Sequence, residues 1–171
     1  MCGLPSGGAN LVTERGMATT STADQHDPDW PKYPETILQF SANPAIEIDL
    51  RQPVTPESIS QLERIGLGTP FAIMTAYDPR GQDLPTQENE RRRKKLNDRL
   101  ASDGYRFAQV DCCSPDGSHC ERSVAVVMPQ DAALDLAREL EQVAIFWFDG
   151  ERFWILGAIV DTDALMLPRS S

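Results

Sequence analysis

Polar side chains cluster where a predicted strand at 71–77 ends and a predicted helix at 86–102 begins. Thr75, Tyr77 and Asp78 supply a hydroxyl, a phenol and a carboxylate at the end of this strand. The first amides of a helix carry positive partial charge and lack partners within the helix, so they attract polar and anionic groups. Ligand sites recur at such junctions in α/β proteins. The pattern therefore predicts a pocket for a small polar ligand, anionic or nucleotide-like.

The predicted helix adds Asn89 and Arg93 to this cluster. Leu96 and Leu100 mark its buried side, and residues three or four positions apart share one helix face. Asn89 and Arg93 lie on that face, so both are expected to point toward the sheet. A purely structural interpretation stays open, in which Asp78 closes a turn and Asn89 caps the helix.

Two further polar residues stand at the ends of other predicted elements. Glu121 precedes an apolar strand, and Gln142 ends a later helix. They either close the same pocket or serve as caps and salt-bridge partners. The ligand-binding residues predicted in this way are Thr75, Tyr77, Asp78, Asn89, Arg93, Glu121 and Gln142. Asp78 and Glu121 are the candidate general bases, because a partly desolvated cleft raises a carboxyl pKa toward neutrality. No complete catalytic motif accompanies them, so whether the protein is an enzyme stays open.

Five consecutive basic residues at 91–95 support an alternative function. In it, the basic helix and an arm beginning at Trp30 dock an acidic protein partner. A solvated helix face, balanced by acidic residues three or four positions away, explains the same run. The formal net charge of −10 disfavours a nucleic-acid partner, so a single-stranded nucleic-acid site on this helix is a weaker third hypothesis.

Three cysteines and a histidine lie close together in the sequence, at Cys112, Cys113, His119 and Cys120. Zinc sites need two well-separated ligand pairs, and this spacing does not provide them. We predict no metal and no cofactor here. The N-terminus shows no secretory signal pattern, which indicates a cytoplasmic protein with reduced thiols and no disulfides.

Hydrophobic periodicity predicts one α+β domain over 29–168, with a disordered tail at 1–28 and disordered residues at 169–171. Met17 is an alternative natural start. No apolar run is long enough to span a membrane. The predicted order is β-α-β-α-β-β-α-β-β, which indicates a mixed sheet of about five to six strands with about three helices packed on it. The last two strands form a hairpin whose predicted turn has two residues, Asp149 and Gly150.

Four segments resemble the bacterial domain of unknown function 3293 family, over about Thr69 to Leu156. They are the apolar strand with its Thr75-Ala76-Tyr77-Asp78-Pro79 end, Glu88-Asn89 before the basic helix, Glu121-Arg122-Ser123 before a strand, and Glu141-Gln142-Val143-Ala144-Ile145. The family pattern has asparagine where this chain has Asp78, and an aromatic residue is common where it has His119-Cys120. The resemblance implies which residues matter and carries no known activity.

Overall fold

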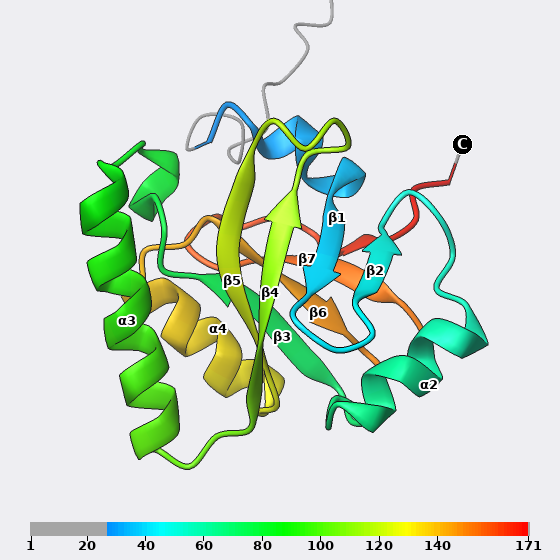
Figure 1. Cartoon of the computed structure of the whole chain (residues 1–171). Coiled ribbons are helices and arrows are strands. Elements are labelled where there is room, and N and C mark those ends of the chain that lie inside the picture. The colour runs from blue at the N-terminus through cyan, green and yellow to red at the C-terminus, as the bar shows by residue number, and fades with distance from the viewer. Residues whose placement is uncertain (1–26, 171) are drawn as a thin grey trace, which may run out of the picture.

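The computed structural model describes residues 27–170, which form one curved sheet with helices packed against it (Figure 1). The strands are β1 (Ile37–Phe40), β2 (Ile46–Asp49), β3 (Phe71–Thr75), β4 (Phe107–Cys113), β5 (Cys120–Val126), β6 (Ala144–Phe148), β7 (Phe153–Gly157) and β8 (Leu165–Met166). The helices are α2 (Pro56–Arg64), α3 (Thr86–Ser102) and α4 (Gln130–Glu139), with short 3-10 helices η1 (Trp30–Glu35) and η2 (Pro79–Gly81). The strand order is β2-β1-β4-β5-β3-β6-β7-β8, and all neighbours pair antiparallel.

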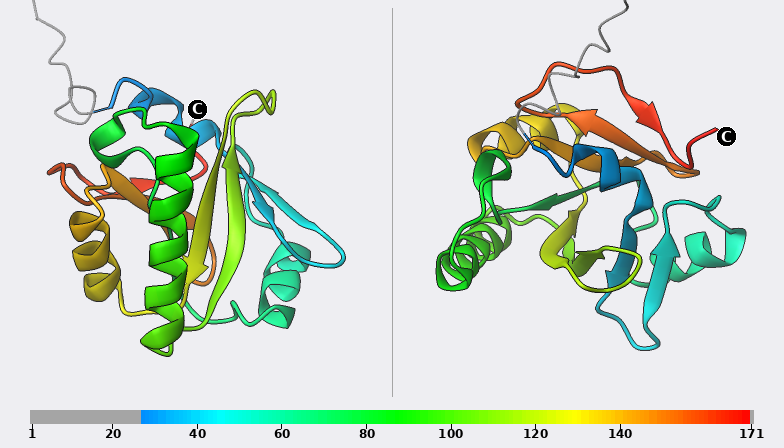
Figure 2. Two further views of the ribbon diagram at one scale, coloured as in Figure 1. Left: turned by 60° about the vertical axis from the view of Figure 1, so that its left-hand side comes forward. Right: turned by 90° about the horizontal axis from the view of Figure 1, so that it is seen from above.

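Side-chain alternation along the strands builds a core on each face of the sheet. In β3, Phe71 and Ile73 join one core, whereas Ala72 and Met74 join the other. The first core also takes side chains from β2 and β7, which lie near opposite ends of the strand order. The sheet must therefore curve toward this face, and Figure 2 shows the resulting half-barrel. Helices α3 and α4 contribute to the second core and cover the convex face.

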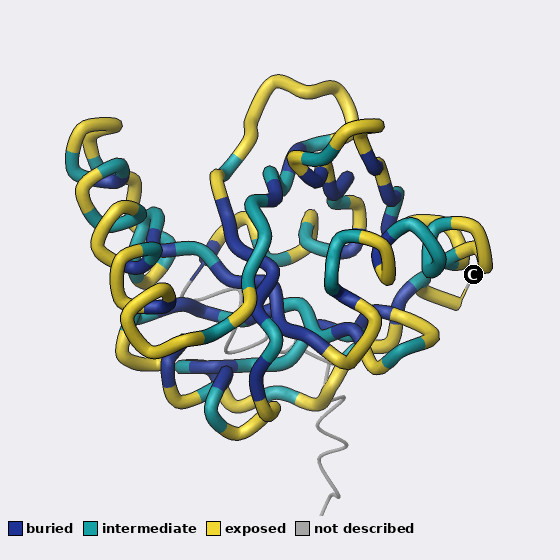
Figure 3. Tube along the Cα trace, turned by 60° about the horizontal axis from the view of Figure 1, so that its bottom comes forward, coloured by how far each residue is buried: buried dark blue, intermediate teal, exposed yellow. Residues whose placement is uncertain are grey.

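Burial follows the strands, while the turns and the outer sides of the helices are exposed (Figure 3). The largest fully buried group on the concave side consists of Phe71, Phe148 and Phe153, whose ring centroids lie 4.8–6.0 Å apart. Such aromatic contacts stabilise a core beyond simple area burial. This aromatic group lies where β3 begins, β6 ends and β7 begins.

Two helix positions follow directly from the sequence. Thr55 caps α2 by accepting a hydrogen bond from the Ser58 amide at 3.1 Å, and Pro56 occupies the first turn, where its missing amide hydrogen costs nothing. The predicted helix at 86–102 is confirmed as α3.

The predicted number and pairing of strands are wrong. The sheet has eight strands, not five to six, and it is antiparallel throughout, not mixed. The additional strands are β1, which pairs with β2 and, far along the chain, with β4, and β8, which is too short to show a periodicity.

The predicted two-residue turn between β6 and β7 is a four-residue connection, 149–152. The side chain of Asp149 accepts hydrogen bonds from the amides of Glu151 and Arg152, which extends the turn. Gly150 adopts a φ of 108°, a positive backbone angle that glycine tolerates because it has no side chain.

Most of the predicted N-terminal tail, residues 1–26, lies outside the described residues, as does Ser171. Asp27 is described and is only 7% exposed. Within residues 27–170, no helix is both long and apolar enough to cross a membrane.

Candidate functional site

A cavity of about 660 Å³ opens at one end of the concave face, and we call it the mouth cavity. Its walls come from the ends of β3 and β4, the starts of β5 and β6, the segment around η1, and the loops after β3 and β4. Apolar residues such as Ile73 and Phe146 lie beside carboxylates in its lining. A cavity of this size can take a small organic molecule.

The strand pattern explains why the lining turns polar. Along the concave face of β5, Ala125 belongs to the core, whereas Ser123 and Glu121, at the next positions of the same parity, line the cavity. β3 repeats this change from Ile73 to Thr75, and Thr75 pairs with Ser123 in register. Along β3 and β5 the concave face is therefore apolar in the core and becomes polar at the end where the mouth cavity opens.

Two residues before β1, Asp27 and Tyr33, line the mouth cavity on the side of η1. The Tyr33 hydroxyl donates a hydrogen bond to Asp27 Oδ2, and Asp27 also accepts from the amide of Asp29 at 2.8 Å. The Tyr33 ring packs against Phe146, with centroids 6.4 Å apart. Burial, followed by the bond to Asp27, raises the pKa of Tyr33. Asp27 thus remains an acceptor at the cavity wall, held by a neutral phenol.

Glu121 is the central ionisable group of the mouth cavity. Its side chain is 31% exposed, and its Oε1 lies 3.4 Å from His119 Nε2. Burial raises the pKa of Glu121 above its usual 4.5, and the charges of Asp78 and Asp27 raise it further, whereas His119 acts in the opposite direction. Both Glu121 and Asp78 line the mouth cavity.

Asp78 and Asn89 form a reciprocal clamp. Asn89 Oδ1 accepts from the Asp78 amide at 3.0 Å, and Asn89 Nδ2 donates to Asp78 Oδ1 at 2.8 Å. The same Asp78 oxygen accepts from the Leu84 amide at 2.9 Å. Asn89 is 5% exposed and lies on the buried face of α3 with Leu96 and Leu100, as the spacing predicts. Its hydrogen-bonding capacity serves the loop 78–84, which matches the structural interpretation of these two residues.

Gln142 secures the same loop from the other side. Its Nε2 donates to the Tyr77 carbonyl at 3.0 Å, and the residue is 7% exposed. Nearby, the Arg80 amide donates to the Glu141 carbonyl at 2.7 Å, and the two side chains form an ion pair. Asp78, Arg80 and Glu141 all have positive φ angles, between 45° and 59°. Three non-glycine residues in this backbone region are costly, and such strain concentrates at functional sites.

Arg93 does not join the cavity lining, although the sequence analysis places it in the site. Its guanidinium is engaged by Glu90 at 2.8 Å, and the Tyr77 hydroxyl also donates to Glu90. Burial and this bond raise the pKa of Tyr77 to about 12. Arg93 therefore acts through a surface network beside the cavity.

Three more residues of the basic run, Arg91, Arg92 and Lys94, are also paired within the protein. Arg92 donates to the carbonyls of Ala76 and Leu140, which ties α3 to β3 and α4. Arg91 pairs with Glu88 and Lys94 with Asp98. These contacts favour the interpretation of 91–95 as a charge-balanced helix face over a docking surface.

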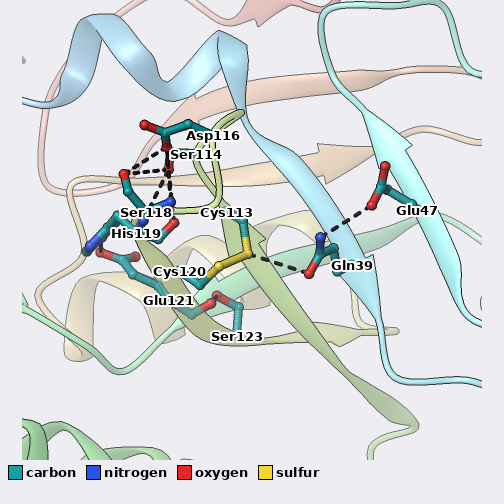
Figure 4. Close-up of a disulfide and its surroundings, with 10 residues drawn as sticks. All are labelled: Gln39, Glu47, Cys113, Ser114, Asp116, Ser118, His119, Cys120, Glu121 and Ser123. Atoms are coloured by element: carbon teal, nitrogen blue, oxygen red, sulfur yellow. Dashed lines mark hydrogen bonds and ion pairs between the residues drawn. A yellow bond between two sulfur atoms is a disulfide. The ribbon is translucent and has the colours of Figure 1, made fainter.

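The cysteines differ from the sequence prediction. Cys113 and Cys120 form a disulfide across the β4–β5 hairpin, as Figure 4 shows, where a reduced pair is predicted. The reason is register, because these residues are direct cross-strand partners. Cys112 is a free thiol in the cavity lining, and burial raises its pKa to about 12. Among the described residues, no group of three or more His, Cys, Asp or Glu side chains is placed to hold a metal ion.

The sequence analysis missed Asp27, Tyr33 and Phe146 as site residues. Asp27 falls in the predicted tail, Tyr33 in the arm that begins at Trp30, and Phe146 in the predicted hairpin. The available signal is a tyrosine among the acidic residues Asp27, Asp29 and Glu35 just before the domain. That signal is too general to identify a lining position before the fold is known.

We expect Glu121→Gln to raise the melting temperature at about pH 7, since the folded state holds the Glu121 proton more tightly than the unfolded chain does. Ionisation of Glu121 therefore costs stability as pH rises above the carboxyl's ordinary value, and below about pH 4 both states are protonated and the cost vanishes. Thermal melts at both pH values check this. A variant that is less stable than wild type at neutral pH would show that Glu121 is a net stabilising group.

The fold and the site together define an α+β domain built on an antiparallel half-barrel with an acid-lined cavity at one end. The model of a family described as "Protein of unknown function (DUF3293)" matches residues 74–145, so this part of the chain is similar to that family. The matched span runs from β3 into β6, and the resemblance expected from the sequence is confirmed over it. No curated protein and no solved structure matches the chain.

Proposed function

We propose that the mouth cavity binds a small organic cation that has an apolar body. The observation that carries this proposal is Glu121, a partly buried carboxylate that faces the charges of Asp78 and Asp27 and has His119 as its side-chain partner. A cation would offset this crowded negative charge. The proposed ligand is still small and polar, as expected from the sequence, but its charge is positive instead of negative.

The balance of charges in the lining supports this choice. The carboxyl-bearing residues are Asp27, Asp29, Glu35, Asp78, Asp83, Asp116 and Glu121, against Lys32 and His119. Lys32 is already paired with Asp29 at 2.8 Å. The basic residues at 91–95 are absent from this lining, so they cannot balance an anion there.

The apolar part of the lining suits the body of the ligand. Ile73, Ala144 and Phe146 come from the concave face of β3 and β6, and the Tyr33 ring packs against Phe146. An aryl or alkyl group placed there would bury apolar area while its cationic head meets Glu121.

Of the two candidate general bases, Glu121 is the better placed to move a proton. Its pKa is raised by burial, which brings a carboxyl closer to the range useful in catalysis. Asp78 is engaged with Leu84 and Asn89 and holds the loop. The cytoplasmic location stays a prediction, and the Cys113–Cys120 disulfide weighs against a fully reducing compartment.

Titration with benzamidine tests the proposal, with neutral benzamide and anionic benzoate as ligands of similar shape. We expect benzamidine to bind with a dissociation constant of roughly 1 mM or lower, and the other two to bind at least about tenfold more weakly. Glu121→Gln should weaken benzamidine by about tenfold or more, the scale of a charged hydrogen bond. The matched control is Glu57→Gln on the exposed first turn of α2, which should bind as wild type. Equal binding of benzoate and benzamidine would refute a cation site.

A further inference from the structure

The Cys113–Cys120 disulfide lies directly beside the residues of the mouth cavity. The two cysteines are cross-strand partners, and the next pair in the register is Cys112 with Glu121, both in the cavity lining. The disulfide also closes the hairpin loop 114–119, which Figure 4 shows above it. One covalent bond thus fixes the base of a segment that forms a wall of the cavity.

The loop itself depends on exposed hydrogen bonds. Asp116 Oδ1 accepts from the hydroxyls of Ser114 and Ser118, each at 2.7 Å, and the Ser114 amide donates to the His119 carbonyl at 2.8 Å. Exposed hydrogen bonds of this kind add little net stability, because water competes for the same groups. The disulfide at its base is therefore a covalent constraint on a loop that also carries His119 beside Glu121.

The two sulfurs differ in access. Cys120 is exposed, whereas Cys113 is 3% exposed. Cys113 Sγ lies 3.8 Å from Gln39 Oε1, and Gln39 Nε2 donates to Glu47 on β2. In the reduced protein the Cys113 thiol can therefore donate a hydrogen bond to Gln39 Oε1, and this buried thiol is not left without an acceptor. The site can accommodate both oxidation states.

We propose that the Cys113–Cys120 pair is a redox switch that sets the ligand affinity of the mouth cavity, with the disulfide form binding more tightly. This inference rests on the proposed function. In the reductive direction an external thiolate attacks Cys120 Sγ, the S–S bond breaks, and Cys113 leaves as a thiolate that takes up a proton. A second external thiol then attacks the mixed disulfide and frees Cys120. Overall, two small-molecule thiols become one disulfide, and the protein gains two electrons and two protons as two thiols.

The test compares the full chain after dithiothreitol with the same chain after a small-molecule disulfide. Two quantities are measured in each state: the affinity for benzamidine, and amide hydrogen exchange across residues 114–121. Reduction should speed exchange there and weaken benzamidine by about tenfold, because binding must then order the loop as well. The control C113S/C120S should match the reduced protein and ignore dithiothreitol.

The outcomes separate the switch from the proposed function. Unchanged exchange on reduction would overturn the switch, as would faster exchange with equal benzamidine affinity in both states. Failure of benzamidine to bind either state would count against the cation site, while faster exchange on reduction would still support a redox-controlled loop.

Discussion

Replacing Asn89 with alanine is expected to lower the free energy of unfolding by roughly 2–3 kcal/mol, more than an ordinary polar substitution on a helix. The change leaves the Asp78 amide without its 3.0 Å acceptor and removes the 2.8 Å bond to the Asp78 carboxylate. Because Asn89 is only 5% exposed, water cannot freely replace these partners. Chemical denaturation of the variant and of wild type measures the loss.

The chain offers a matched control on the same helix. Asn97 Oδ1 is buried without a hydrogen-bond partner, so Asn97→Ala removes an unsatisfied group and adds a better helix former. We expect Asn97→Ala to be neutral or slightly stabilising. Similar losses from both variants would mean that the clamp between Asp78 and Asn89 contributes nothing beyond generic helix packing.

Removal of the disulfide should have the next largest effect on stability. We expect C113S/C120S to lose about 2 kcal/mol, because the unfolded chain regains the freedom that a crosslink with a sequence separation of 7 restricts. Gln39 Oε1 is available to a serine hydroxyl at position 113, so the substitution need not orphan a buried group. Denaturation with and without dithiothreitol checks the value.

The reductant supplies an internal control for this second prediction. Wild type in dithiothreitol should unfold as readily as the double variant, and the variant itself should not respond to the reductant. A wild-type midpoint that is the same in both conditions would show that the crosslink does not contribute to stability.

Local signals in the sequence predicted the elements that depend on near neighbours. The cap at Thr55 and the face of α3 that carries Asn89, Leu96 and Leu100 both follow from spacings of a few residues. The wrong predictions concern strand pairings and registers that no local pattern specifies. β1 pairs both with β2 next to it in the chain and with β4 far along it, and the disulfide depends on the register of the β4–β5 hairpin.

The same reasoning explains the mixed result for the site. Spacing indicated that Asp78 and Asn89 would meet, and they do. Glu121 lines the cavity because alternation along β5 directs it to the concave face, which only the curvature of the sheet defines. Arg93 shares the helix face of Asn89, but Glu90 lies one turn away and engages it. Arg93 thus pairs with Glu90 and does not line the cavity.

The place of β1 in the sheet sets an order in which the protein can assemble. Ile37 pairs with Cys113 and Phe40 with Val110, so β1 must wait for β4 before it gains its second neighbour. During synthesis the β1–β2 hairpin leaves the ribosome early, with Leu38 still uncovered and one strand edge open. Distant pairing of this kind slows folding and prolongs exposure to aggregation. The N-terminal hairpin is therefore a part of the nascent chain that stays exposed to aggregation until β4 has been made.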